Sequence, residues 1–167
     1  FAEMINAQKY EYVTVWDPHS DVVPALLNNC IVRHCSQFVC HIPATADTVL
    51  IAPDAGAQKK VAECAKAMGL QYLTATKHRD TNTGEITNTT LEGVLLHRKR
   101  YLIVDDICDG GRTFVELAKI IKPCGAKVDL YVTHGIFSKG ESVFDDLITN
   151  IYCPNPWPNA RFTIKVD

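Results

Sequence analysis

Short apolar runs alternate along the chain with longer stretches in which apolar residues recur at helical spacing. The runs are typical of buried strands and lie at 11–16, 49–52, 102–104 and 127–132, with another beginning at Tyr72. The stretches at 57–68 and 114–122 carry apolar residues three and four positions apart and end near glycine or proline, as amphipathic helices do. This alternation predicts an α/β fold with a central parallel sheet and helices on both faces.

The other segments give weaker signals, and we expect one domain built around one sheet. They favour helices at 1–9, 20–28 and 143–148, an edge strand at 37–42 and a final strand at 161–166. Residues 77–90 are polar, contain glycine and lack a periodic apolar face, which predicts a mobile loop or a hairpin of weak strands. The proline-rich residues 154–158 predict an irregular loop.

Composition and charge narrow the possible ligands. The 167 residues are 47% hydrophobic and 22% charged, with a net charge of −2, which is ordinary for a globular domain. Such a balance exerts no general pull toward nucleic acid or anionic membranes, so any recognition of phosphate has to be local. No apolar stretch approaches the roughly 20 residues of a membrane helix. We therefore expect a small ligand, and neither nucleic acid nor a membrane as partner.

The cysteines point to a reducing compartment. There are seven, an odd number, without a Cys-x-x-Cys motif, so a disulfide framework is not expected and the cytoplasm is the default. Cys30, His34, Cys35, Cys40 and His41 crowd one segment, and zinc binds such side chains. Their spacing fits no standard zinc pattern, so buried small thiols and surface histidines are the favoured interpretation.

The strongest chemical signal begins with two adjacent acids. Asp105 and Asp106 follow a buried strand, at the edge where open α/β sheets bind their ligands. Two neighbouring carboxylates on a rigid element can accept hydrogen bonds from two sugar hydroxyls, or can face a magnesium ion. The competing interpretation is a loop that simply begins with two solvated acids.

A turn rich in glycine follows these acids. Gly110 and Gly111 permit a tight turn before the helix that is expected from about Thr113. Free backbone N–H groups at the start of that helix can then face an anion. Together with the preceding acids, the turn predicts a site for a sugar phosphate.

Two other pairs of residues are candidates for work on phosphate. His19 and Asp54 each follow a predicted strand and would meet at one edge of the sheet if those strands are neighbours. Lys77 and Arg79 are two residues apart, so in an extended loop both point the same way, as two charges converging on one phosphoryl group require. The alternatives are a helix cap for Asp54, a polar turn residue for His19 and an exposed basic pair.

Five segments, in one order along the chain, resemble motifs of ribose-phosphate pyrophosphokinases. They are Asp17-Pro18-His19, Pro53-Asp54-Ala55-Gly56, Lys77-His78-Arg79, the binding loop from Asp105 to Thr113, and Thr133-His134-Gly135-Ile136-Phe137-Ser138. The resemblance implies a type I phosphoribosyltransferase (Rossmann-like) fold. It also implies that residues 1–167 are a single domain of this kind, corresponding to the C-terminal half of a two-domain enzyme.

The resemblance assigns the binding loop to ribose 5-phosphate. Asp105 and Asp106 would hold the 2- and 3-hydroxyls of the ribose, while the segment comprising Asp109, Gly110, Gly111, Arg112 and Thr113 would surround the 5-phosphate. Similar enzymes usually have a threonine at the position of Gly110, so one hydroxyl donor is lost here. Arg112 either substitutes for it as a charged ligand or faces solvent.

The resemblance also implies a reaction and its cofactor. The anomeric hydroxyl of ribose 5-phosphate would attack the β-phosphorus of ATP, giving AMP and phosphoribosyl pyrophosphate (PRPP) for nucleotide and NAD biosynthesis. Lys77 and Arg79 would neutralise the developing charge, with His19 also at the catalytic centre. A Mg²⁺ ion close to His19 and Asp54 would bridge to the nucleotide phosphates, and homo-oligomers are typical of the family.

Two other functions remain open. A type I phosphoribosyltransferase would consume PRPP with a base or amine, but the Lys77 to Arg79 motif has no evident counterpart in that class. A non-catalytic protein associated with PRPP synthetase would keep the fold and bind PRPP or a partner. Retention of the catalytic cation pair argues against that third function.

Overall fold

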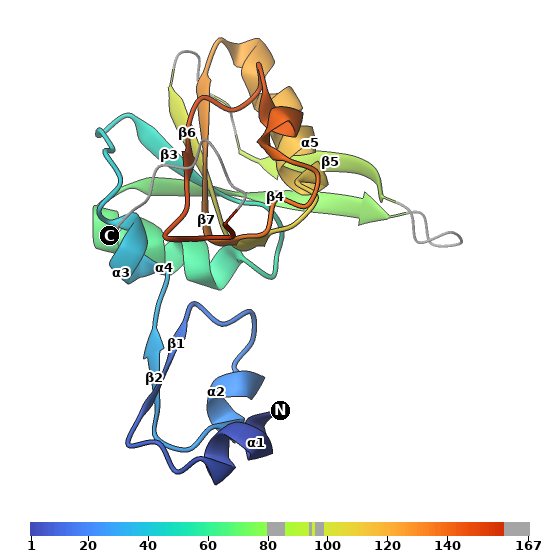
Figure 1. The fold of residues 1–167 in the computed structure, drawn as a ribbon. Coiled ribbons are helices and arrows are strands. Elements are labelled where there is room, and N and C mark those ends of the chain that lie inside the picture. Colours follow the sequence, from blue (N-terminus) through green and yellow to red (C-terminus); the bar gives the residue numbers. More distant parts are fainter. Residues whose placement is uncertain (80–85, 94, 96–98, 159–167) are drawn as a thin grey trace.

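The computed structural model describes residues 1–79, 86–93, 95 and 99–158, and within them all side chains except those of 77–79 and 86–88. In this part of the chain a sheet of seven strands forms the centre, in the order β5-β4-β3-β6-β7-β8 with β9 paired to β7 (Figure 1). The strands are β3 (Thr48–Ala52), β4 (Gln71–Arg79), β5 (Ile86–Glu92), β6 (Arg100–Cys108), β7 (Lys127–Gly135), β8 (Ile151–Tyr152) and β9 (Asn155–Pro156). All pairs are parallel except β4 with β5.

Helices cover both faces of this sheet, as the alternating pattern predicts. On one face α5 (Arg112–Ile121) packs against a cluster that includes Ile103 of β6. On the other face α3 (Ser36–Val39) and α4 (Gln58–Met68) pack against a cluster that includes the next residue, Val104. Consecutive residues of the central strand thus face opposite layers and are both fully buried, which explains why such strands are continuously apolar.

The two long helices follow directly from their residue spacing. In α5 the buried residues Phe114, Leu117, Ala118 and Ile121 form one face, the i, i+3, i+4, i+7 stripe of an amphipathic helix. The following 3₁₀ turn η1 (Lys122–Cys124) contains the proline expected to end it. Helix α4 ends at Gly69, whose φ of 67° is the left-handed conformation usual after a helix C-terminus.

The first 33 residues form a separate lobe, which differs from the single sheet that we expected. It contains α1 (Ala2–Ala7), β1 (Val13–Trp16), α2 (Val22–Leu26) and β2 (Cys30–Arg33), drawn in blue in Figure 1. Strands β1 and β2 pair in parallel with each other in a two-stranded sheet of their own. Both helices and β1 were expected from the sequence, whereas β2 was not.

Several weaker predictions are wrong. Residues 37–42 do not form an edge strand, because Phe38 and Val39 are buried on α3. The helix expected at 143–148 is replaced by the short 3₁₀ turn η2 (Glu141–Phe144). Strand β9 lies inside the loop expected at 154–158, and β8 was not predicted. Residues 77–90 include parts of the β4–β5 hairpin, while the strand expected at 161–166 lies outside the described residues.

Two further observations concern alternatives raised by the sequence. Within the described ranges, no helix combines the length and hydropathy needed to cross a membrane. The three thiols of the cysteine-rich segment occupy different environments, since Cys35 is buried, Cys40 is exposed and Cys30 is intermediate.

Candidate functional site

The chain connections diverge where β3 and β6 lie side by side in the sheet. Helix α4 leads from β3 to β4 on one side, and α5 leads from β6 to β7 on the other. Chain connections that diverge from two adjacent parallel strands leave a crevice at their C-terminal ends, where α/β proteins bind ligands. Asp54 follows β3, and Asp105 and Asp106 lie near the end of β6. The topology therefore brings three of the predicted site residues to one edge.

Each of the paired acids has one oxygen engaged by the protein. The backbone N–H of Asp106 donates to Oδ1 of Asp105 at 2.9 Å. Oδ2 of Asp106 accepts from Nδ1 of His19 at 2.8 Å and lies 3.2 Å from Nζ of Lys60. In the described part of the chain, no buried side-chain oxygen or nitrogen lacks a hydrogen-bond partner. The remaining oxygen of each acid therefore faces the crevice or solvent, where a ligand can donate to it.

The two carboxylates differ in charge because their surroundings differ. Burial raises the pKa of Asp105 to about 7, and the negative charge of Asp106 adds to this effect. Burial also acts to raise the pKa of Asp106, but Lys60 and His19 outweigh it, so this pKa is lowered. Asp106 is thus ionised at neutral pH, whereas Asp105 carries a proton part of the time.

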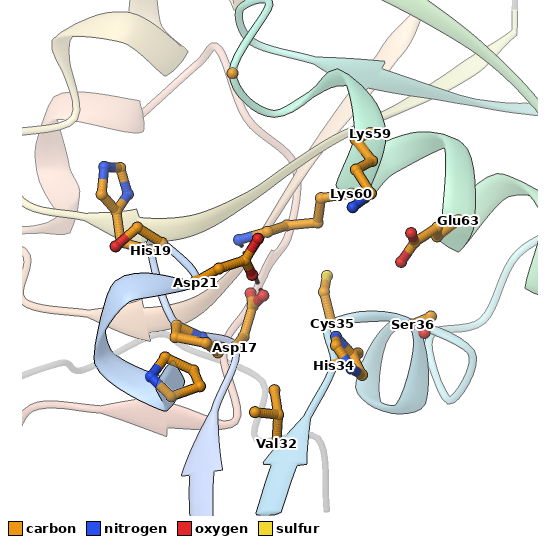
Figure 2. A pocket seen from close by; sticks show the side chains of 14 residues that line it. Asp17, His19, Asp21, Val32, His34, Cys35, Ser36, Lys59, Lys60 and Glu63 are labelled. Atoms are coloured by element: carbon orange, nitrogen blue, oxygen red, sulfur yellow. Dashed lines mark ion pairs between the residues drawn. The ribbon is translucent and has the colours of Figure 1, made fainter. Parts of the chain in front are cut away.

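Lys60 and Asp17, neither of which was predicted as a site residue, lie next to Asp106 and to each other. Lys60, on the first turn of α4, extends toward Asp17 (Figure 2). Its Nζ lies 2.9 Å from Oδ1 of Asp17. Asp17 follows β1 and is only 3% exposed. Its Oδ2 accepts a hydrogen bond from the hydroxyl of Thr133 at 2.6 Å. The only sequence signal for Asp17 was its place at the start of the Asp-Pro-His motif.

The strands of His19 and Asp54 are not neighbours, because β1 pairs with β2 in the separate lobe. His19 nevertheless reaches the site through its bond to Asp106, and its side chain is 87% exposed. Asp54 accepts a hydrogen bond from the backbone N–H of Ala57, just before α4, at 3.1 Å. This bond has the local character of the capping role considered for Asp54.

The turn that follows the acids contains the two glycines of the predicted anion-binding loop. Gly111, the residue before α5, has a φ of 74°, and a Cβ atom there would lie 2.5 Å from the ring of Phe144. Gly110 has no positive φ. A Cβ atom at Gly110 would contact the side-chain carbons of Lys139 at 3.5 and 3.6 Å, so a cationic side chain runs beside the loop. The backbone N–H groups of Phe114 and Val115 both donate to the carbonyl oxygen of Gly111, which closes the first turn of α5.

The structure directs Arg112 along the helix surface. Its Nε donates to Oε1 of Glu116, one turn further on, at 2.8 Å, and its side chain is 79% exposed. Thr113 lies at the second position of α5, and Asp109 is exposed at the end of β6.

Lys77 and Arg79, the predicted cation pair, lie on the β4–β5 hairpin. The backbones of Lys77 and Arg79 belong to β4 and pair with β5, with an irregularity between residues 78 and 79. Strand β3 ends at Ala52, opposite Thr74, so this part of β4 extends past the edge that carries Asp54. The side chains of Lys77 and Arg79 lie outside the described part of the structure.

The residues at this edge fit a magnesium ion. The described residues contain no cluster of three His, Cys, Asp or Glu side chains able to hold a metal. However, Mg²⁺ usually binds through one or two carboxylates together with substrate phosphates. The charge of Asp54 contributes to the raised pKa of Asp105, so these carboxylates lie near each other. The bond from Nδ1 of His19 to Asp106 leaves Nε2 on an exposed ring, the arrangement that is typical of metal-bound histidines.

Comparison with known proteins identifies similar sequences. A profile of the phosphoribosyl transferase domain matches residues 31–166. Ribose-phosphate pyrophosphokinase 2 of Archaeoglobus fulgidus is 31% identical over 85% of the chain and 52% of its own length. The ribose-phosphate pyrophosphokinase of Thermococcus kodakarensis is 35% identical over 71% of the chain and 43% of its own length. The chain thus spans about half, or less, of the length of these relatives.

Solved structures show the same fold. Phosphoribosylpyrophosphate synthetase from Mycobacterium smegmatis superposes with a TM-score of 0.72 over 91% of this chain and 51% of its own, at 18% identity. Adenine phosphoribosyltransferase from Leishmania tarentolae gives a TM-score of 0.55 over 75% of this chain and 70% of its own, at 12% identity. At such identities these likenesses establish the fold alone.

Proposed function

Because the chain belongs to the phosphoribosyl transferase domain family, we propose that its paired acids and glycine turn bind ribose 5-phosphate for the synthesis of PRPP. One observation carries this proposal: Asp105 and Asp106 each keep one oxygen open at the head of the turn that begins α5. Two acceptors side by side match two adjacent hydroxyls of a pentose. The turn that follows can hold the 5-phosphate at the N-terminus of α5, where the helix dipole favours negative charge.

The proposed reaction transfers the diphosphoryl group of ATP. The 1-hydroxyl of ribose 5-phosphate attacks the β-phosphorus, the bond to the α-phosphate oxygen breaks, and AMP leaves. A loose phosphoryl transition state requires positioning and positive charge, which Lys77 and Arg79 supply from the hairpin. His19 and Asp54 would hold a Mg²⁺ ion, which would supply positive charge to the nucleotide phosphates. The similarity to ribose-phosphate pyrophosphokinases supports this reaction over the use of PRPP with a base.

We further propose that this domain works beside a second domain, as the C-terminal half of the enzyme. The relatives are about twice as long or longer. Of the twelve large hydrophobic side chains that are exposed among the described residues, nine lie within residues 1–31. A concentration of exposed apolar side chains marks an interaction surface. We therefore expect full activity only when that surface is covered.

Titration calorimetry of the 167-residue chain tests the binding step. Ribose 5-phosphate should bind, whereas ribose, which lacks the phosphate, and glucose 6-phosphate, which lacks the pentose, should bind at least tenfold more weakly. Equal binding of all three sugars would contradict the proposed site.

Product analysis of the longer protein separates the three functions. Release of AMP from ATP in the presence of ribose 5-phosphate supports the pyrophosphokinase. Release of pyrophosphate from PRPP and a base supports the phosphoribosyltransferase. If neither AMP nor pyrophosphate is released, the result supports a non-catalytic binder.

A further inference from the structure

Lys60 links two carboxylates that belong to different sheets. Its ammonium lies 2.9 Å from Asp17, which follows β1 of the N-terminal lobe, and 3.2 Å from Asp106 on β6 of the main sheet. The side chains of these acids are only 4% and 7% exposed, and that of Lys60 is 21% exposed. Neither acid is therefore well solvated, and each depends on the lysine as a counter-charge.

We propose that Lys60 is a positioning residue for the pentose, which fixes Asp106 so that its open oxygen faces the ligand. The inference rests on the proposed binding of ribose 5-phosphate. Lys60 acts through the carboxylates, because its ammonium is directed to Oδ1 of Asp17 and to Oδ2 of Asp106, the oxygen that His19 also engages. It acts by determining which carboxylate oxygen remains available and where that oxygen points.

The surroundings of Asp106 show why the lysine is needed. The other side chain bonded to Oδ2 is His19, which is 87% exposed and so cannot hold a buried carboxylate rigidly. Asp105 lies next to it on the same strand and repels it whenever both are ionised. Asp17, on the far side of the lysine, is fixed by Thr133 from β7 and by its backbone bond to Arg33 of β2. Lys60 thus connects Asp106, whose other side-chain partner is exposed, to Asp17, which is held by two further hydrogen bonds.

If the ammonium is removed, Asp17 and Asp106 become two buried negative charges without a shared cation. Their repulsion would turn Asp106 away from Asp17 and toward the open crevice. Figure 2 shows Lys60 extending from α4 toward Asp17, while the adjacent Lys59 points elsewhere in the same pocket.

Four substitutions test this role in the 167-residue chain, with ribose 5-phosphate as the probe. Lys60→Met keeps the aliphatic stem and removes the charge, and should weaken binding about tenfold or more, the scale of one lost charge-assisted hydrogen bond. Lys60→Arg keeps the charge and should restore binding to within about threefold of the wild type. Lys66→Met removes an exposed lysine from the same helix and should leave binding unchanged.

Lys60→Gln keeps the experiment decisive if the methionine variant does not fold, because the amide can still donate one hydrogen bond. It should bind ribose 5-phosphate more weakly than Lys60→Arg does. Urea unfolding of each variant identifies the range of urea concentration in which it is folded. If Lys60 has only a structural role, its substitution would lower the unfolding midpoint without weakening the binding of ribose 5-phosphate by the folded variant.

The steady-state kinetics of the longer protein provide a second readout. A positioning role for the pentose predicts that Lys60→Met raises KM for ribose 5-phosphate by a larger factor than it lowers kcat. If wild-type protein fails to bind ribose 5-phosphate, the proposed function is wrong. If wild-type protein binds it and folded Lys60→Met or Lys60→Gln binds equally well, the role of Lys60 is refuted while the proposed function stands.

Discussion

Asp105 combines burial with a neighbouring charge, and this combination has a consequence for stability. Its pKa is raised from 3.8 to about 7 in the folded chain. Between these two pH values the folded state retains a proton that the unfolded state has lost. The contribution of this residue to stability therefore falls as the pH rises from about 4 to about 7, and remains low above that.

Asp105→Asn removes this pH dependence while keeping an oxygen that can accept the backbone hydrogen bond of Asp106. We expect the variant to gain stability relative to wild type as the pH rises, by roughly 1–3 kcal/mol at pH 8. Urea unfolding at pH 5 and pH 8, with chelator present, measures the difference. Asp145→Asn, at an exposed acid, controls for the loss of one charge. A difference between Asp105→Asn and wild type that is the same at both pH values would refute the prediction.

The residues of the candidate site were predictable from the sequence only where they are close together along the chain. Asp105, Asp106 and the glycines of the following turn form one continuous segment, so their strand, turn and helix gave the pattern directly. Lys60 carried no such signal, because its importance comes from Asp17 and Asp106, which are far from it in sequence. Thr133 reaches Asp17 across 116 positions, and a single sequence does not record such contacts.

Among the elements, α5 depends on one backbone conformation at its start. Gly111→Ala would place a methyl group 2.5 Å from Phe144 and strain a φ of 74°, so the turn must move. We expect binding of ribose 5-phosphate to fall at least tenfold and stability to fall by about 1–3 kcal/mol. Calorimetry and urea unfolding measure the two effects.

Gly125→Ala is the matched control for this substitution. Gly125 has a φ of 66°, but a Cβ atom there would have no neighbour within 4 Å. It should therefore cost only the backbone strain and leave ligand binding intact. If Gly111→Ala bound ribose 5-phosphate as well as Gly125→Ala does, the loop would not be the phosphate site.

The β4–β5 hairpin is the element assigned to catalysis. In the longer protein, Lys77→Ala should lower the rate of AMP release about a hundredfold, while binding of ribose 5-phosphate persists. This is the scale of losing one group that stabilises the transition state. Lys119→Ala, at an exposed lysine of α5, is the control and should leave turnover unchanged. Unchanged turnover in Lys77→Ala would remove the hairpin from the mechanism.

Elements with a long, regular apolar pattern were predictable, and short or irregular ones were not. Helix α4 and strand β3 each bury a repeating set of residues. In contrast, Val143, Phe144, Leu147 and Ile148 are spaced like a helix, yet the chain leaves helical geometry between them. Asp145 has a ψ of 141° and Asp146 a φ of 61°. Two-residue strands such as β8 contain no period at all, so only their pairing with β7 reveals them.

At the scale of the whole molecule, the N-terminal lobe and the main sheet differ in how they are held. Strands β1 and β2 alternate between intermediate and exposed residues, whereas every residue of β3 is buried. The lobe contacts the rest through Asp17 with Lys60 and Thr133, through His19 with Asp106, through the backbone of Trp16 with His134, and through the rings of Trp16 and Phe38. Less buried surface and fewer buried hydrogen bonds lower the free energy of local opening.

Hydrogen exchange tests this difference together with the connection to the site. Backbone amides at 13–16 and 30–33 should exchange faster than those at 48–52. Saturation with ribose 5-phosphate should slow exchange in β1, because the ligand restrains Asp106, which is tied through Lys60 to Asp17 at the end of β1. In Lys60→Met that slowing should disappear even at ligand concentrations that saturate the variant. Equal protection of β1 and β3 without ligand would show that the lobe is as firmly held as the sheet. Slowing that persists in Lys60→Met would mean that the connection runs through His19, His134 or Thr133 instead.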